Sequence, residues 1–230
     1  MQDTPARAAL LLLADGRFPA GTYAHSGGLE PAIAGGGVRT VTDLEAFLIG
    51  RLRTVGLVTA AFTAAACRAF LKEPTQPGRT AAVQALEEEY DARTPSPTQR
   101  ATSRQLGRQL VRVMTLITPA VNLEGLGSAP HQPIALGAGH AVLGLGPHDA
   151  ALTSLHEAAA GPVAAAVRLL SVDPFETHGV LARLSPVIDE LTAEAVERCS
   201  SLCNLPAYAG PLLDTNAERH HTRQTRLFAS

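Results

Sequence analysis

The chain has 230 residues, of which 46% are hydrophobic, 4% aromatic and 17% charged, and its formal net charge at pH 7 is −2. This weak acidic balance gives no electrostatic reason to expect nucleic acid or an anionic membrane as a partner, so small molecules and proteins are favoured. A chain of this length can bury one good core, which in the absence of tryptophan must be built from small and aliphatic side chains on closely packed helices.

Helical periodicity recurs along the whole chain, whereas the alternating pattern of strands is missing from the sequence. We therefore predict a single all-α domain of about nine or ten helices over residues 1–230, with a flexible N-terminus of about residues 1–5. The first helix is expected at residues 5–14, a segment too short for a membrane span and without the basic flank of a signal peptide. Three cysteines cannot all pair within one chain, so a reducing, cytoplasmic location is expected.

The segment 19–30 reads PAGTYAHSGGLE and is expected to be a glycine-rich loop that turns into a helix. We expect Ser26 to be the N-cap, His25 to brace the loop by a hydrogen bond, and Tyr23 to pack. Serine beside histidine also suggests an alternative, a small helical metal-dependent hydrolase that uses His25 and Ser26. Adjacent helical residues point about 100° apart and no acidic residue at a motif spacing orients the histidine, so we favour a rigid loop that a protein partner recognises.

A long helix is predicted over residues 42–71, with Thr42 as N-cap, Glu45 reaching back in a capping box, and a bend near Gly56. Residues 84–92 should form a short acidic helix. Ser96 and the proline after it should start a strongly amphipathic helix that reaches about residue 117.

A row of basic residues follows one face of this amphipathic helix at four-residue spacing, namely Arg100, Arg104, Arg108 and Arg112. Such a row can grip a phosphate, but the sequence has no glycine-rich phosphate loop with its lysine. We therefore favour an internal or interfacial ion-pair network, for which the acidic run 87–91 is the candidate partner.

Four further helices are expected in the second half of the chain. Residues 133–145 are small and apolar, and Gly137 and Gly139 should permit close helix approach; this face is expected to favour self-association. Residues 149–170 and 173–199 read as long amphipathic helices, the second capped by Asp173 and interrupted or kinked at Pro186. A last helix should run from about residue 211 toward the C-terminal tail.

The tail, about residues 219–230, is predicted to dock onto another protein. It carries Leu227 and Phe228, two large apolar side chains that no local neighbour can cover. Apolar anchors beside arginines such as Arg223 and Arg226 are typical of binding hot spots.

The eight histidines raise the hypothesis of a nickel or zinc site, because imidazole suits both ions. Only His220 and His221 lie together, and they are weak candidates for a transient contact. The sequence contains no spacing typical of a permanent metal site, so neither a resident metal nor another cofactor is expected.

Three segments together resemble the UreF family of urease accessory proteins. The family carries a Pro-x-Gly-x-(aromatic)-x-His-Ser-x-Gly-Leu-Glu block near its start, which residues 19–30 match. Its central Arg-x-x-Ser-Arg-x-x-Gly helix is matched by residues 100–107, and its terminal Arg-Leu-Phe-x-Ser by residues 226–230. Four positions depart from the family pattern, namely His221, Asp173, Pro174 and His178.

The resemblance implies an all-α homodimer that is a urease maturation chaperone rather than an enzyme. It implies assembly with the UreD accessory protein, also called UreH, and with the GTPase UreG, so that nickel is delivered into apo-urease. Carried onto this chain, it makes the following residues candidates for partner binding: Tyr23, His25, Ser26, Glu30, Arg100, Arg104, Arg223, Arg226, Leu227 and Phe228.

Overall fold

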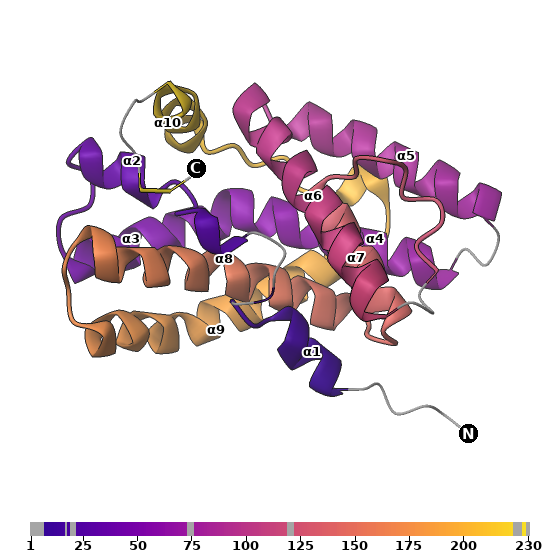
Figure 1. Cartoon of the computed structure of the whole chain (residues 1–230), viewed down its shortest axis with the longest axis horizontal. Coiled ribbons are helices and arrows are strands. Elements are labelled where there is room, and N and C mark those ends of the chain that lie inside the picture. Colours follow the sequence, from indigo (N-terminus) through magenta and orange to yellow (C-terminus); the bar gives the residue numbers. More distant parts are fainter. Residues whose placement is uncertain are drawn as a thin grey trace.

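The computed structural model describes residues 7–16, 18, 22–72, 76–118, 122–222 and 227–228, and over these residues the fold is all-α without a strand, as predicted. Figure 1 shows how the helices are arranged. They are α1 (Arg7–Leu13), α2 (Leu29–Ala34), α3 (Val41–Arg51), α4 (Leu57–Lys72), α5 (Gln76–Arg93), α6 (Pro97–Ile117), α7 (Gln132–Val142), α8 (Pro147–Leu169), α9 (Pro174–Arg198) and α10 (Pro211–His221). Short 3-10 turns lie at η1 (Thr22–Ala24) and η3 (Leu202–Asn204), and a π-helical turn, η2 (Leu52–Gly56), joins α3 to α4.

Helix α4 is the central helix, and α7, α8 and α9 pack around it. Its alanines and Phe62 are buried, which fits a core made of small side chains. A Cβ on Gly137 of α7 would lie 2.2 Å from the carbonyl oxygen of Thr63 in α4, so the predicted close approach is confirmed there. The apolar face of α7 is thus hidden inside this chain, and our argument that it drives self-association is wrong.

Helices α6 and α9 begin where the sequence offers a single capping residue. The Ser96 hydroxyl accepts a hydrogen bond from the Gln99 amide at 3.1 Å, and the Asp173 carboxylate accepts one from the Phe175 amide at 2.8 Å, as predicted for α6 and α9. Helix α9 continues through Pro186, so the predicted break does not occur there.

The capping box of α3 lies two residues earlier than predicted. Thr40 is the N-cap and exchanges hydrogen bonds with Asp43, instead of Thr42 with Glu45. Asp43 forms the capping box because its carboxylate accepts hydrogen bonds from two backbone amides at 3.0 Å each. The Glu45 carboxylate instead pairs with Arg183 of α9 at 2.7 Å.

The bend predicted near Gly56 is the π-helical turn η2, where one extra residue per turn redirects the helix. The whole stretch Val41–Lys72 is long and apolar enough to cross a membrane by length and composition alone. However, 67% of its most apolar window is buried inside the fold, which is the pattern of a core helix.

Segments from near both ends of the described chain meet at the candidate site. Helix α10 packs against α2 and α6, and the C-terminal segment returns to α2 (Figure 1). Residues from the beginning and the end of the sequence therefore lie side by side.

Candidate functional site

A hydrogen-bonded cluster joins α2 to the C-terminal segment; we call it the Glu30 clasp, made of Glu30, His220, Leu227 and Phe228. The Glu30 carboxylate accepts hydrogen bonds from the backbone amides of Leu227 at 2.8 Å and Phe228 at 3.0 Å. It also lies 3.1 Å from Nε2 of His220. Burial raises the pKa of Glu30, but the two amides and His220 outweigh it and hold that pKa below its usual value. The clasp therefore works with an ionised carboxylate.

In the clasp, one of the two apolar tail side chains is buried and the other is exposed. Phe228 is only 5% exposed and belongs to the main core, with the Arg168 guanidinium 5.1 Å from its ring centre. Leu227 is 74% exposed. This corrects the expectation that Phe228 is a free anchor for a partner, because the main core of its own chain covers it. Arg223 and Arg226 lie outside the described residues.

The loop before α2 has the backbone that its glycines suggested. Gly27 and Gly28 have φ of 63° and 88°, a left-handed region that favours glycine. Gly28 rather than Ser26 is the N-cap residue of α2, but the buried Ser26 hydroxyl still accepts from the Glu30 amide at 3.2 Å. A buried serine engaged in this way is poorly placed to attack a substrate, which argues against the hydrolase alternative.

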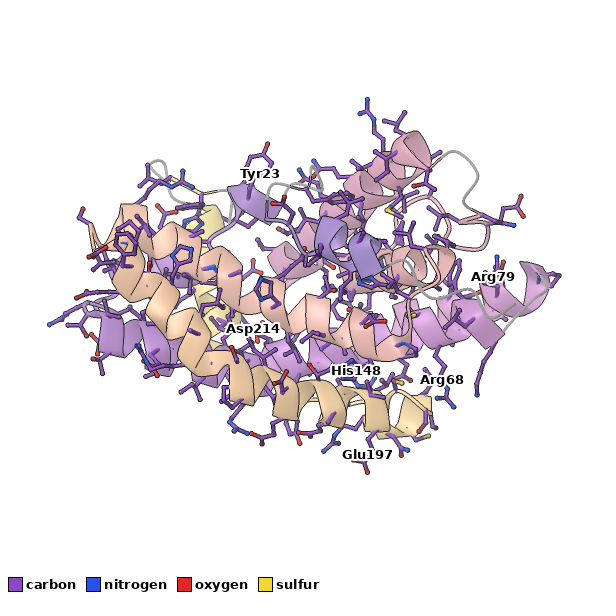
Figure 2. All side chains as sticks on the ribbon, turned by 90° about the horizontal axis from the view of Figure 1, so that it is seen from below. Tyr23, Arg68, Arg79, His148, Glu197 and Asp214 are labelled. Atoms are coloured by element: carbon purple, nitrogen blue, oxygen red, sulfur yellow. The ribbon has the colours of Figure 1, made fainter. Side chains whose placement is uncertain are left out.

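Tyr23 and His25 flank this loop differently. Tyr23 is 67% exposed and projects outward from η1 (Figure 2), so the expectation that it packs is wrong. His25 is half-buried, and burial lowers its pKa, so the ring is biased to its neutral form. His25 also lines the large cavity described below.

The predicted ion-pair network between the basic row and the acidic run is confirmed for Arg104. Its guanidinium lies 2.9 Å from Glu87 and 2.6 Å from Asp91, and it also donates to the Ala129 carbonyl at 2.8 Å. The buried His131 completes the network, since its amide donates to Glu87 and its Nε2 lies 2.9 Å from Asp91. The network thus ties α5, α6 and the start of α7 together.

Arg100 belongs to the same network at longer range. It donates to the carbonyls of Thr94 and Pro95, at 2.5 Å and 3.0 Å, and lies 3.9 Å from Asp91. Arg108 and Arg112 are exposed. The inner arginines of the row therefore stabilise this chain, while the outer two face solvent.

Opposing effects set the acidity of the network. Burial is the largest influence on Glu87 and raises its pKa, which the contacts with His131 and Arg104 only partly offset. Burial also acts on Asp91, but hydrogen bonds from His131 and Arg104 bring its pKa below the usual value. Burial lowers the pKa of His131, so its ring is biased to the neutral form.

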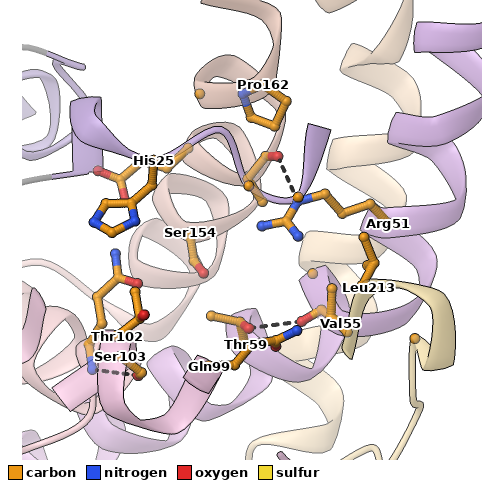
Figure 3. A pocket seen from close by; sticks show the side chains of 18 of the residues that line it. His25, Arg51, Val55, Thr59, Gln99, Thr102, Ser103, Ser154, Pro162 and Leu213 are labelled. Atoms are coloured by element: carbon orange, nitrogen blue, oxygen red, sulfur yellow. Dashed lines mark hydrogen bonds between the residues drawn. The ribbon is translucent and has the colours of Figure 1, made fainter. Parts of the chain in front are cut away.

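A cavity of about 550 Å³ lies between the loop before α2 and helices α3, α6, α8 and α10. Arg51 of α3 points into it, and Ser154 and Glu157 of α8 are also among its lining residues (Figure 3). The sequence analysis missed these three residues. A usable signal was present for Glu157, which is an isolated acidic residue within an alanine-rich helical stretch.

The histidine and cysteine candidates do not gather into a metal site. Over the parts of the chain that are described, no group of three or more His, Cys, Asp or Glu is placed to hold a metal ion. His220 is buried in the Glu30 clasp, whereas His221 is exposed. Of the family departures on α9, Asp173 caps the helix and Pro174 starts it, while Nδ1 of the exposed His178 lies 2.8 Å from the Pro174 carbonyl.

Comparisons with known proteins cover nearly the whole chain. The family model described as UreF matches residues 38–185. A protein of Mycolicibacterium vanbaalenii is 41% identical over 223 residues, which is 97% of this chain and 98% of that protein. A protein of Mycobacterium sp. strain JLS is 40% identical over 96% of this chain and 97% of its own, and one of Mycobacterium tuberculosis H37Rv is 41% identical over 97% and 98%. All three are named urease accessory protein UreF.

Proposed function

The chain belongs to the UreF family of urease accessory proteins, and from this membership we propose that it is a non-catalytic adaptor in urease maturation. In this proposal it assembles with UreD, also called UreH, and with the GTPase UreG, and the assembly delivers nickel into apo-urease in the cytoplasm. The adaptor itself needs no cofactor.

One observation carries the proposal, namely the end-to-end match to relatives that bear the accessory-protein name. The buried position of Ser26 supports a non-catalytic role, since its hydroxyl accepts a hydrogen bond from the Glu30 amide in the first turn of α2. The exposed apolar groups around α2 suit a protein that works by binding.

We infer that the partner surface lies around α2. Tyr23 precedes this helix and Leu227 is held against it by Glu30, and both side chains are largely exposed. Exposed aromatic and aliphatic side chains on a rigid base lose little conformational freedom on binding, which favours them as anchors. His25, Ser26 and Glu30 would then support the surface from below rather than touch the partner.

The homodimer is also part of the proposal, but on a different surface from the one expected at α7. Leu11 and Leu12 on α1 and Leu116 and Ile117 at the end of α6 are exposed. Both helices contribute to the second apolar cluster of the fold, so these side chains extend a buried cluster to the surface. Light scattering of the purified chain, alone and with Leu116→Glu, measures whether this surface pairs two copies; a Leu116→Glu chain as dimeric as the wild type would reject it.

The proposed function is tested by co-expressing the chain with apo-urease, UreD and UreG in cells that lack their own UreF. We expect urease activity and urease-bound nickel to depend on the chain, and UreD to co-purify with it. Leu227→Ala should reduce co-purification at least tenfold, as for other hot-spot anchors. Phe175→Ala, a control on the exposed start of α9, should leave it unchanged. Equal urease activation with and without the chain would refute the proposal.

A further inference from the structure

The cavity contains the partly buried guanidinium of Arg51, which has no counter-charge among the described residues. Nε of Arg51 donates to the Ala158 carbonyl at 3.3 Å, which anchors the inner end of the guanidinium. Over the described part of the chain, Arg51 forms no ion pair, and its Nη atoms have no hydrogen-bond partner. Burial lowers the pKa of Arg51, yet a guanidinium stays protonated in proteins. The Nη donors of this partly buried cation are therefore available to an anion that enters the cavity.

A second unused donor faces the same cavity. Ser154 is 5% exposed and lines the cavity on α8, the helix whose Ala158 carbonyl holds Arg51 (Figure 3). Within the described residues, the Ser154 hydroxyl has no hydrogen-bond partner. This donor is therefore also available to a guest in the cavity.

The acidic residues of the cavity wall do not neutralise Arg51. Glu157 and Asp214 line the cavity, and neither pairs with Arg51. Burial raises the pKa of Glu157 to about 8, and burial followed by the nearby Glu218 raises the pKa of Asp214. Near neutral pH Glu157 is therefore mostly protonated and does not compensate the charge of Arg51.

The polar wall also carries hydroxyl groups. Thr59 and Ser103 line the cavity beside the buried Tyr90, and burial raises the pKa of that phenol, so it stays protonated. Thr59 uses its own proton on the Val55 carbonyl at 2.8 Å. The wall therefore offers neutral hydroxyls in the same cavity as the Arg51 guanidinium, and no carboxylate among the described residues forms an ion pair with Arg51.

From this arrangement we propose that the cavity binds a small oxyanion, held by the Nη atoms of Arg51 and by the hydroxyl of Ser154. The planar guanidinium suits two oxygens of one anion, whether tetrahedral like phosphate or planar like a carboxylate. The volume of the cavity accommodates either with accompanying water. This site is independent of the proposed role in urease maturation.

The test is a titration of the purified chain with inorganic phosphate, sulfate and acetate, at pH 7 and at an ionic strength held constant with chloride. Calorimetry should show saturable binding of at least one of these oxyanions. Preference for phosphate and sulfate would assign a tetrahedral guest, and preference for acetate a carboxylate. Failure of all three to bind saturably would refute the site, whatever the outcome of the urease experiment.

Variants assign the binding to the cavity. Arg51→Met should weaken binding at least tenfold, and Ser154→Ala severalfold. Arg112→Met, which removes an exposed arginine, should bind like the wild type. Wild-type affinity in both single variants, Arg51→Met and Ser154→Ala, would overturn the assignment. If Arg51→Met does not fold, wild-type affinity in Ser154→Ala alone would overturn it.

Discussion

Replacing Phe228 by alanine tests whether the C-terminal segment belongs to the fold of this chain. Truncating a fully packed phenylalanine in a protein core costs about 3–5 kcal/mol. Phe228 is well buried but lies near the chain end, with the Arg168 guanidinium as one neighbour, so its surroundings can relax. We therefore expect Phe228→Ala to lower the free energy of unfolding by about 2–3 kcal/mol, including about 0.5–1 kcal/mol from the lost cation–π contact.

The adjacent residue provides a matched control. Leu227 has the same backbone anchorage to Glu30 but an exposed side chain, so Leu227→Ala should change the free energy of unfolding by less than about 0.5 kcal/mol. Urea unfolding followed by far-ultraviolet circular dichroism measures both variants. A Phe228→Ala chain as stable as the wild type, or an equal loss in Leu227→Ala, would refute the position of Phe228 in the core.

Glu30→Ala examines the same clasp from its other side. Two backbone amides and His220 would lose their acceptor, and each unmet buried donor costs about 1–3 kcal/mol, less where water enters. We expect a loss of about 2 kcal/mol in total. Because both variants open one clasp, the Glu30→Ala, Phe228→Ala double variant should lose clearly less than the two single losses added together. Strict additivity would mean that the two residues act separately.

Two further predictions concern the core and the cavity. Gly137→Ala should lower the free energy of unfolding by about 2–3 kcal/mol in urea unfolding, because its Cβ would lie 2.2 Å from the Thr63 carbonyl oxygen. The Cβ of the control Gly139→Ala would have its nearest neighbour 3.6 Å away, so this variant should be neutral or slightly stabilising. Equal effects of the two variants would contradict the close helix contact. Glu157 has its pKa raised from 4.5 to about 8, so the native state holds its proton longer than the unfolded state, and the free energy of unfolding should fall as pH rises from about 4.5 to about 8. Glu157→Gln should remove that decline and be more stable than the wild type by about 2 kcal/mol near pH 9 in chemical unfolding, with little difference near pH 5; parallel pH profiles would show that the carboxyl is well solvated.

Local signals predicted helices well where a single signal was present. Ser96 and Asp173 cap α6 and α9 because their side chains bond amides two or three residues ahead, a distance that sequence alone defines. At α3 two capping patterns overlap, Thr40 with Asp43 and Thr42 with Glu45, and the first forms because the Asp43 carboxylate accepts from two backbone amides. Both patterns fit the sequence, so the pattern alone did not identify the right one.

The candidate site depended even more on distant contacts. The basic row and its acidic partners were predictable because α5 and α6 are neighbours in sequence and both carry a patterned charge. The cavity was not, because Arg51 meets α8 across more than a hundred residues. The apolar character of Phe228 was evident, but whether it packs on this chain or on another depends on Glu30, which no local pattern connects to it.

The Glu30 clasp also bears on the order of events during folding. The hydrogen bonds from the two backbone amides to the Glu30 carboxylate join residues that are 197 and 198 positions apart in the sequence. Closing the clasp therefore restricts almost the whole polypeptide at once. Contacts of such long range form only after local helices and neighbouring pairs have reduced the chain's freedom. A nearly complete bundle with an open clasp should therefore precede the native state, and the same species should reappear first when the native protein opens. Amides of residues 227 and 228 should accordingly exchange with solvent faster than those of α4, through an opening that leaves the central helix closed.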